Sequence, residues 1–305
     1  MKKIIILFLA LMWGRMQACD VCGCINGNAS IGTLASNRFS WWGFQSTFRS
    51  YETYLTGIRH SKEMYWRSDI LLRWNFHPRV QLFTWLPYQT SWQLRDLGST
   101  SVRGWGDAQI MLNGVLLDKR NEDEESVHFL ALGVMLKMPT GARVSYSDVY
   151  RNLYPGTGSW DQMVIAQYSW GINRQNFFQS EGSYSIKGKD QDGFRNGDVM
   201  QISGWWTHKS MFRKGNVLSS LGWTSENFQS PVISGNESVD VPGVAGYVHS
   251  FRGGFYWLGK RGMLACQMQI PVFQNLNQKQ IQQRLGVTVG YQFLIKQKIK
   301  RDENK

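Results

Sequence analysis

Residues 284–295, RLGVTVGYQFLI, alternate between apolar and polar side chains along their length. Successive side chains of an extended strand point to opposite faces. The odd-numbered positions from Leu285 to Phe293 therefore share an apolar face, and the even-numbered positions from Gly286 to Gln292 share a polar one. A soluble sheet with one buried face shows the same alternation, so the rest of the chain must decide what the apolar face contacts.

The chain begins with an export signal. Two lysines precede an apolar run at 4–13 that is too short to span a bilayer as a helix. We interpret residues 1–18 as a signal peptide that is cleaved after Ala18. Cys19 follows directly, so acylation of Cys19 is an alternative, although no Leu stands three residues before it. Export combined with a repeated strand pattern predicts a location in the outer membrane of a Gram-negative bacterium.

The composition fits a membrane protein that spans with strands. Mean hydropathy is only -0.34, and aromatic residues make up 14% of the chain. A barrel protein can have such a low mean hydropathy because only every second residue of a barrel strand contacts lipid. The 34 Lys and Arg against 22 Asp and Glu give a formal charge of +12. Since the basic residues are scattered through strand-like segments, a cationic lumen or lipid-headgroup contact explains them better than nucleic acid binding.

Twelve strand-like segments follow the signal, separated by Gly, Asn, Asp and Pro residues at hairpin spacing. They span residues 39–50, 63–76, 79–90, 105–118, 126–138, 160–171, 176–187, 198–208, 216–228, 243–257, 262–274 and 284–295. We predict an all-β fold, a single transmembrane antiparallel β-barrel of about 12 strands over residues 39–295, with both ends in the periplasm. Residues 19–38 are expected to form a plug or to lie at the periplasmic mouth, and residues 296–305 to form a basic tail.

The segment 63–76 shows the two faces of such a wall. Trp66 and Trp74 lie on one face about 26 Å apart along the strand, which matches the two aromatic girdles of a membrane barrel. A soluble β-sandwich, the alternative, has no use for this spacing. Arginine near the bilayer midplane costs roughly 2–4 kcal/mol, so the charged residues of the other face must line a polar lumen. With the polar face of 105–118, the lumen-lining candidates are Arg67, Asp69, Arg73, Asp107, Gln109 and Asn113.

Three Gly-rich stretches also stand out: VRGWGDAQIMLN at 102–113, KMPTG at 137–141 and PGTGSWD at 155–161. They resemble the landmarks of the MetA-pathway of phenol degradation family of outer-membrane transporters. The stretch ACDVCGC at 18–24 resembles a Bacteroidota-type subgroup with an N-terminal CDxCGC motif. The resemblance covers most of the mature chain, and it implies an outer-membrane barrel that transports hydrophobic or aromatic cargo.

The same motifs have local explanations. Gly104 and Gly106 permit a tight approach to a strand, and Asp107 can accept backbone N–H bonds or face the lumen. Asp161 follows a loop that contains Pro and Gly. Turn chemistry without a ligand role is the simpler interpretation. A binding role at the loops for Asp107 and Asp161 is the alternative.

Cys19, Cys22 and Cys24 form a CxxCxC cluster at the expected mature N-terminus. Cys266 alternates with apolar residues of a lipid-facing strand face and is not expected to join them. One pair would form a disulfide in an oxidising compartment, Cys19 with Cys22 or Cys24, because a C-x-C bridge is strained. Alternatively, all three thiols would bind a soft metal, Cu(I) or Zn(II), although a zinc site usually has four ligands.

The predicted function is a non-enzymatic channel or transporter in which small-molecule cargo diffuses through the lumen. Outer-membrane lipid is an expected partner, nucleic acid is not, and the sequence leaves the oligomeric state open. A metal-handling barrel that uses the Cys cluster is the second interpretation. An outer-membrane lipid hydrolase is the third, but neither His128 after Ser126 nor His249 before Ser250 lies in a recognisable nucleophile motif.

Overall fold

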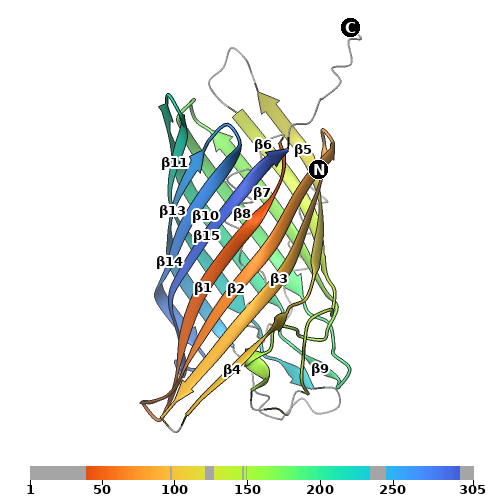
Figure 1. The fold of residues 1–305 in the computed structure, drawn as a ribbon, viewed down its shortest axis with the longest axis vertical. Coiled ribbons are helices and arrows are strands. Elements are labelled where there is room, and N and C mark those ends of the chain that lie inside the picture. Colours follow the sequence, from red (N-terminus) through yellow and green to blue (C-terminus); the bar gives the residue numbers. More distant parts are fainter. Residues whose placement is uncertain are drawn as a thin grey trace, which may run out of the picture.

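The computed structural model describes residues 39–96, 98–120, 127–145, 148, 150–233 and 245–295. These residues form one closed antiparallel β-barrel with tilted strands (Figure 1). Its wall strands are β1 (Ser40–Leu55), β2 (Ile58–His77), β3 (Val80–Arg95), β4 (Gly98–Trp105), β5 (Gln109–Arg120), β6 (Val127–Lys137), β7 (Asp161–Gly171), β8 (Asn176–Ile186), β10 (Val199–Phe212), β11 (Gly215–Phe228), β13 (Gly246–Leu258), β14 (Gly262–Leu276) and β15 (Ile281–Ile295). The short elements η1 (Arg151–Leu153), β9 (Phe194–Arg195) and β12 (Val232–Ile233) lie in the connections.

The first and last strands close the barrel. β1 pairs with β2 on one side and with β15 on the other, where Ser40 lies opposite Ile295. At this seam Trp42 of β1 stacks on Phe293 of β15, with ring centroids 4.7 Å apart. The closure leaves neither terminal strand with a free edge, and a sheet surrounded by lipid cannot tolerate one.

The two ends of the barrel differ in the length of their connections. The end that holds the start of β1 and the end of β15 has short connections, and we call it the turn end. The opposite end, which we call the loop end, carries the long connections 138–160, 187–198 and 229–245 (Figure 1). Outer-membrane barrels place short turns in the periplasm and long loops outside.

β4 and β5 share one position in the wall. β3 pairs with β4 over residues 88–95 and with β5 over residues 80–85. The described residues therefore form twelve wall positions, which confirms the predicted strand number. The prediction of one strand at 105–118 was wrong in detail, because the strand is interrupted at residues 106–108 and β4 lies before the break. β4 has the sequence GSTSVRGW, and its small polar residues give little apolar alternation.

The first hairpin is longer than predicted. The expected strands ended at residue 50 and began at residue 63, whereas β1 runs to Leu55 and β2 starts at Ile58. Thr56 and Gly57 both have positive φ, 49° and 83°, as in a two-residue type I′ hairpin turn. The charged side chains among the added residues, Glu52, Arg59 and Lys62, lie together on one face in place of apolar ones, so apolar alternation could not reveal them.

The inner and outer faces of the wall differ as predicted. On β2, Trp66, Ile70 and Trp74 are 51%, 40% and 41% exposed, whereas the alternate residues Asp69 and Arg73 are 3% and 0% exposed. β15 shows the same division. Among the described residues, no helix is both long and apolar enough to span a membrane.

Exposed tryptophans gather toward both ends of the outer face. Those near the turn end are Trp42, Trp74, Trp170, Trp206 and Trp257, and those toward the loop end are Trp66, Trp105, Trp160 and Trp223. Indole rings prefer the headgroup level of a bilayer, so these two groups mark the borders of the apolar band.

A charge placed on this apolar band should destabilise the barrel according to its depth. Leu132 of β6 lies on the outer face between the two tryptophan groups, and Phe212 lies exposed at the turn end of β10. Leu132→Arg should lower the free energy of unfolding in lipid by about 2–4 kcal/mol, whereas Phe212→Arg should cost only about 0–1 kcal/mol. Denaturant titration of the refolded protein in bilayers, followed by Trp fluorescence, measures both. Equal losses would contradict the proposed membrane position.

Candidate functional site: the barrel lumen

The structure places all six lumen candidates on the inner side of the wall, but not at one point. Arg67 and Asp69 of β2 form an ion pair, in which Nε of Arg67 donates to Oδ1 of Asp69 at 2.7 Å. Arg73, further along β2, has its guanidinium 5.4 Å from the ring centroid of Phe83. The other three lie in the break between β4 and β5 and on β5 itself.

Asn113 of β5 belongs to a polar belt on the inner wall. Its Nδ2 donates to Oε1 of Gln81 on β3 and to Oε1 of Gln167 on β7, both at 3.3 Å. Nε2 of Gln167 in turn donates to Oε2 of Glu181 on β8 at 2.9 Å. These four side chains are nearly fully buried, so the belt holds polar groups in fixed positions across five consecutive wall positions.

Asp107 belongs to a buried network of charges toward the loop end. Nζ of Lys137 lies 3.0 Å from Oδ2 of Asp107 and 2.9 Å from Oδ2 of Asp161. Nζ of Lys187 lies 3.2 Å from the same oxygen of Asp161. The two positive and two negative groups balance, and buried charges are tolerated only when they are paired in this way. Asp161, which the sequence placed at a loop, is the first residue of β7.

The same carboxylates also bind backbone groups of the long connections. Asp107 accepts N–H bonds from Gly141 and Thr157, both at 2.9 Å. Asp161 accepts an N–H bond from Gly188 at 3.1 Å. Asp107, in the break before β5, and Asp161, at the start of β7, therefore each tie the wall to a connection at the loop end.

Three glycines let these backbones pack together. A Cβ on Gly141 would lie 2.7 Å from the carbonyl carbon of Gly106, and a Cβ on Gly156 would lie 2.5 Å from that of Gly141. The N–H of Gly156 donates to the carbonyl of Ala142 at 2.8 Å. The three Gly-rich sequence motifs thus meet at one place, and their described contacts are turn and packing contacts.

Further ion pairs join two of the loops to each other. Nη2 of Arg151 lies 3.3 Å from Oδ2 of Asp190, and Nη1 of Arg143 lies 3.2 Å from Oδ2 of Asp192. The guanidinium of Arg151 also lies 3.5 Å from the ring centroid of Phe194. Connections 138–160 and 187–198 therefore form one structure at the loop end (Figure 1).

One side of the inner wall carries an apolar patch. Phe83 and Trp85 of β3 stack with centroids 5.9 Å apart at its centre. We call this set the inner apolar patch, and its members are Trp41, Leu71, Phe83, Trp85, Met111, Met135, Met163 and Ile165. The inner surface from β1 to β7 is thus partly apolar, although the sequence predicted a polar lumen there.

The sequence analysis did not identify several charged residues of the inner wall. Lys137, Lys187 and Glu181 are buried, and two arginines on β1 and β13, Arg49 and Arg252, are half-buried on the inner wall. The available signal was strand parity, since Lys137 and Glu181 alternate with outward-facing neighbours. Parity can identify the face of a residue, but it cannot identify its partners across the barrel.

The cysteine and histidine hypotheses have different outcomes. Cys19, Cys22 and Cys24 lie outside the described residues, so their disulfide or their Cu(I) or Zn(II) site stays a prediction. Cys266 is exposed, as its lipid-facing position predicted. Within the described ranges, no cluster of three metal-ligating side chains occurs.

Neither histidine weighed for hydrolysis has a nucleophile in contact among the described residues. Nδ1 of His128 lies 2.8 Å from the hydroxyl of Tyr168, and its ring stacks on Trp170. His249 is exposed on the outer face of β13, whereas Ser250 is buried on the inner face. Successive strand residues point to opposite faces, which separates this pair.

Comparison with known proteins identifies the fold. The COG4313 outer membrane channel from Pseudomonas putida F1 shares 16% identity and a TM-score of 0.61, with 84% of this chain and 96% of that chain covered. The CymD monoaromatic hydrocarbon channel shares 9% identity and a TM-score of 0.49, over 92% and 95% of the two chains. The β domain of the Bordetella autotransporter BrkA shares 11% identity and a TM-score of 0.46, over 84% and 100%. No family model and no curated protein matches the chain.

The likeness to the Pseudomonas channel shows a common architecture. This chain has the fold of an outer-membrane β-barrel of twelve strands. At this level of identity, cargo and mechanism must be argued from the chain's own residues.

Removing the central lysine of the buried network should destabilise the barrel strongly. Lys137→Met leaves Asp107 without its cation, and breaking a buried ion pair costs about 3–5 kcal/mol. Arg143→Met removes a partly exposed pair and should cost about 0–1 kcal/mol. Adding Asp107→Asn to Lys137→Met should recover part of the loss. Urea titration in lipid measures the series, and equal losses for the two single variants would refute the network's role.

The close packing of the glycines predicts that two Gly→Ala variants differ in the rate at which a protease cuts the loop. Gly156→Ala forces the new Cβ against the backbone of Gly141, so connection 138–160 should detach and be cut faster by an added protease. Gly182→Ala on β8 is the matched control, because its Cβ meets nothing within 4 Å. Limited proteolysis with mass spectrometry follows the cleavage. Unchanged cleavage of the Gly156 variant would show that the loop can move aside without detaching.

Proposed function

We propose that this chain is a non-enzymatic channel of the Gram-negative outer membrane through which small molecules diffuse. The observation that carries the proposal is the inner wall itself, where a polar belt, buried charges and an apolar patch all face the lumen of a closed barrel. Narrow lumens select by size and by the groups that line them. A barrel built only for support needs no such division of its inner surface.

The inner apolar patch supports a cargo with a hydrophobic or aromatic part. Phe83 and Trp85 stack on the inner wall, and Met111, Met135 and Met163 pack with them in one buried cluster that a cargo would reach by displacing flexible thioether side chains. Methionine adapts its shape to varied apolar partners and makes favourable contacts with aromatic rings. This chemistry agrees with the cargo implied by the resemblance to the phenol-degradation transporter family.

The channel proposal predicts permeation that depends on the inner wall. Liposomes that hold the refolded mature chain should swell in small neutral solutes such as urea and erythritol, at rates that fall with solute size. Gly286→Trp adds a large side chain on the inner face of β15 and should lower the swelling rate roughly twofold or more.

Gly182→Trp is the matched control, because Gly182 lies on the outward-facing side of β8 with open space around it. Its swelling rate should equal that of the parent chain. Folded protein that gives no swelling above empty liposomes, or equal effects of the two tryptophans, would refute diffusion through the lumen.

A further inference from the structure

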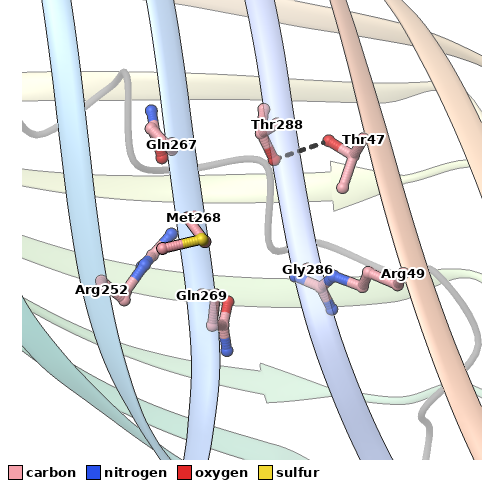
Figure 2. A pocket seen from close by; sticks show the side chains of 8 residues that line it. All are labelled: Thr47, Arg49, Arg252, Gln267, Met268, Gln269, Gly286 and Thr288. Atoms are coloured by element: carbon pink, nitrogen blue, oxygen red, sulfur yellow. Dashed lines mark hydrogen bonds between the residues drawn. The ribbon is translucent and has the colours of Figure 1, made fainter.

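Two inner arginines lie in one row across four neighbouring strands. Arg49 of β1 lies opposite Gly286 of β15, Gly286 lies opposite Gln269 of β14, and Gln269 lies opposite Arg252 of β13. Neighbouring strands are about 4.8 Å apart, so the two arginine Cα atoms are separated by roughly 14 Å. Figure 2 shows both side chains directed toward the two strands between them.

A recess opens between the arginines. Gly286 has no side chain, and a Cβ built there would meet only ordinary contacts of 3.7 and 3.8 Å. The recess itself is small, with a cavity volume of about 10 Å³, and it is partly open. Its lining residues are Thr47, Arg49, Arg252, Gln267, Met268, Gln269, Gly286 and Thr288 (Figure 2).

The recess is rich in hydrogen-bond donors. Two guanidinium groups and two glutamine amides reach it, and the hydroxyls of Thr47 and Thr288 lie 3.1 Å apart at its edge. Among the residues that the structure describes, no acidic side chain lines it. Guanidinium groups donate only, so this surface favours a ligand that accepts several hydrogen bonds.

The protein compensates the two arginines only partly. Among the described residues, neither guanidinium has a carboxylate oxygen within 4.0 Å. Arg49 donates a hydrogen bond to the hydroxyl of Tyr51, Glu226 attracts both arginines, and Tyr256 and Glu181 attract Arg252. Oε2 of Glu226 already accepts a bond from Nε2 of Gln269 at 3.2 Å. Both guanidiniums are half-buried on the inner wall, and a bound anion would supply the close counter-charge that they lack there.

We propose that Arg49 and Arg252 form a binding subsite for the carboxylate group of a small molecule. A planar guanidinium matches a carboxylate with two parallel hydrogen bonds, and two arginines can hold both carboxylate oxygens. The glutamine amides add neutral donors beside them. This inference rests on the proposed channel function and narrows its cargo to small organic acids, with the organic part free to contact the lumen wall.

The first experiment measures benzoate against the uncharged benzamide. Ion current through the mature chain in a planar bilayer should fall saturably as benzoate is added, and benzamide should have no such effect. Arg49→Gln and Arg252→Gln should each weaken the benzoate effect roughly tenfold or more, because a hydrogen bond to a charged group contributes about 1.5–3 kcal/mol. Arg252→Lys keeps the charge but loses the paired donors, so its benzoate effect should lie between those of the parent chain and of Arg252→Gln.

Arg284→Gln is the control for total charge. Arg284 lies at the loop end of β15, exposed and paired with Glu52 at 2.6 Å, outside the recess. It should leave the benzoate effect unchanged. Heat-modifiable migration on a gel shows that each variant is folded.

A binding measurement separates the subsite from the channel. Calorimetric titration of benzoate into the detergent-solubilised chain should show binding that Arg252→Gln weakens roughly tenfold or more. Binding without any permeation would refute the channel and leave the subsite standing. Permeation without benzoate binding, or binding that both Gln variants retain, would overturn the subsite. Inorganic phosphate that binds as tightly as benzoate, through the same arginines, would overturn the assignment to carboxylates.

Discussion

The closed hydrogen-bonded ladder between β1 and β15 is the constraint on which the rest of this structure depends. In lipid, no water is present to satisfy a free strand edge, so the barrel must close before its outer face can be apolar. The seam is held along the whole of both strands and is covered outside by the stacked rings of Trp42 and Phe293. Once closed, the wall separates two environments, and each strand must alternate between them.

Closure also determines where polar groups can be placed. Charges excluded from the outer face gather inside, where each needs a partner. Near the loop end they pair with one another, as Lys137 does with Asp107 and Asp161, and their spare lone pairs bind loop backbone. The middle of the barrel differs, because the recess that Arg49 and Arg252 face has no carboxylate in its lining within the described part of the chain. The first arrangement stabilises the fold, and the second leaves room for a ligand.

The alternation of apolar and polar residues predicted the architecture, because a strand between lipid and lumen requires that alternation. The twelve expected segments correspond to the twelve wall positions, and Trp66, Ile70 and Trp74 face outward as their alternation requires. The prediction failed where lipid no longer imposes the pattern. The first hairpin extends past the membrane with charged side chains in place of apolar ones, and β4 is too rich in Gly and Ser to show alternation.

By itself, the sequence determined the fold class, the strand number and the face of most residues in the lipid-contacting parts of the strands, because every second position there contacts lipid. Only the tertiary structure decided which inner residues meet. Lys137, Asp107 and Asp161 come from separate parts of the chain, and Arg49 and Arg252 are brought near each other by closure of the barrel. Strand order and register set these neighbours, and a local pattern carries no information about pairing between strands that are distant in sequence.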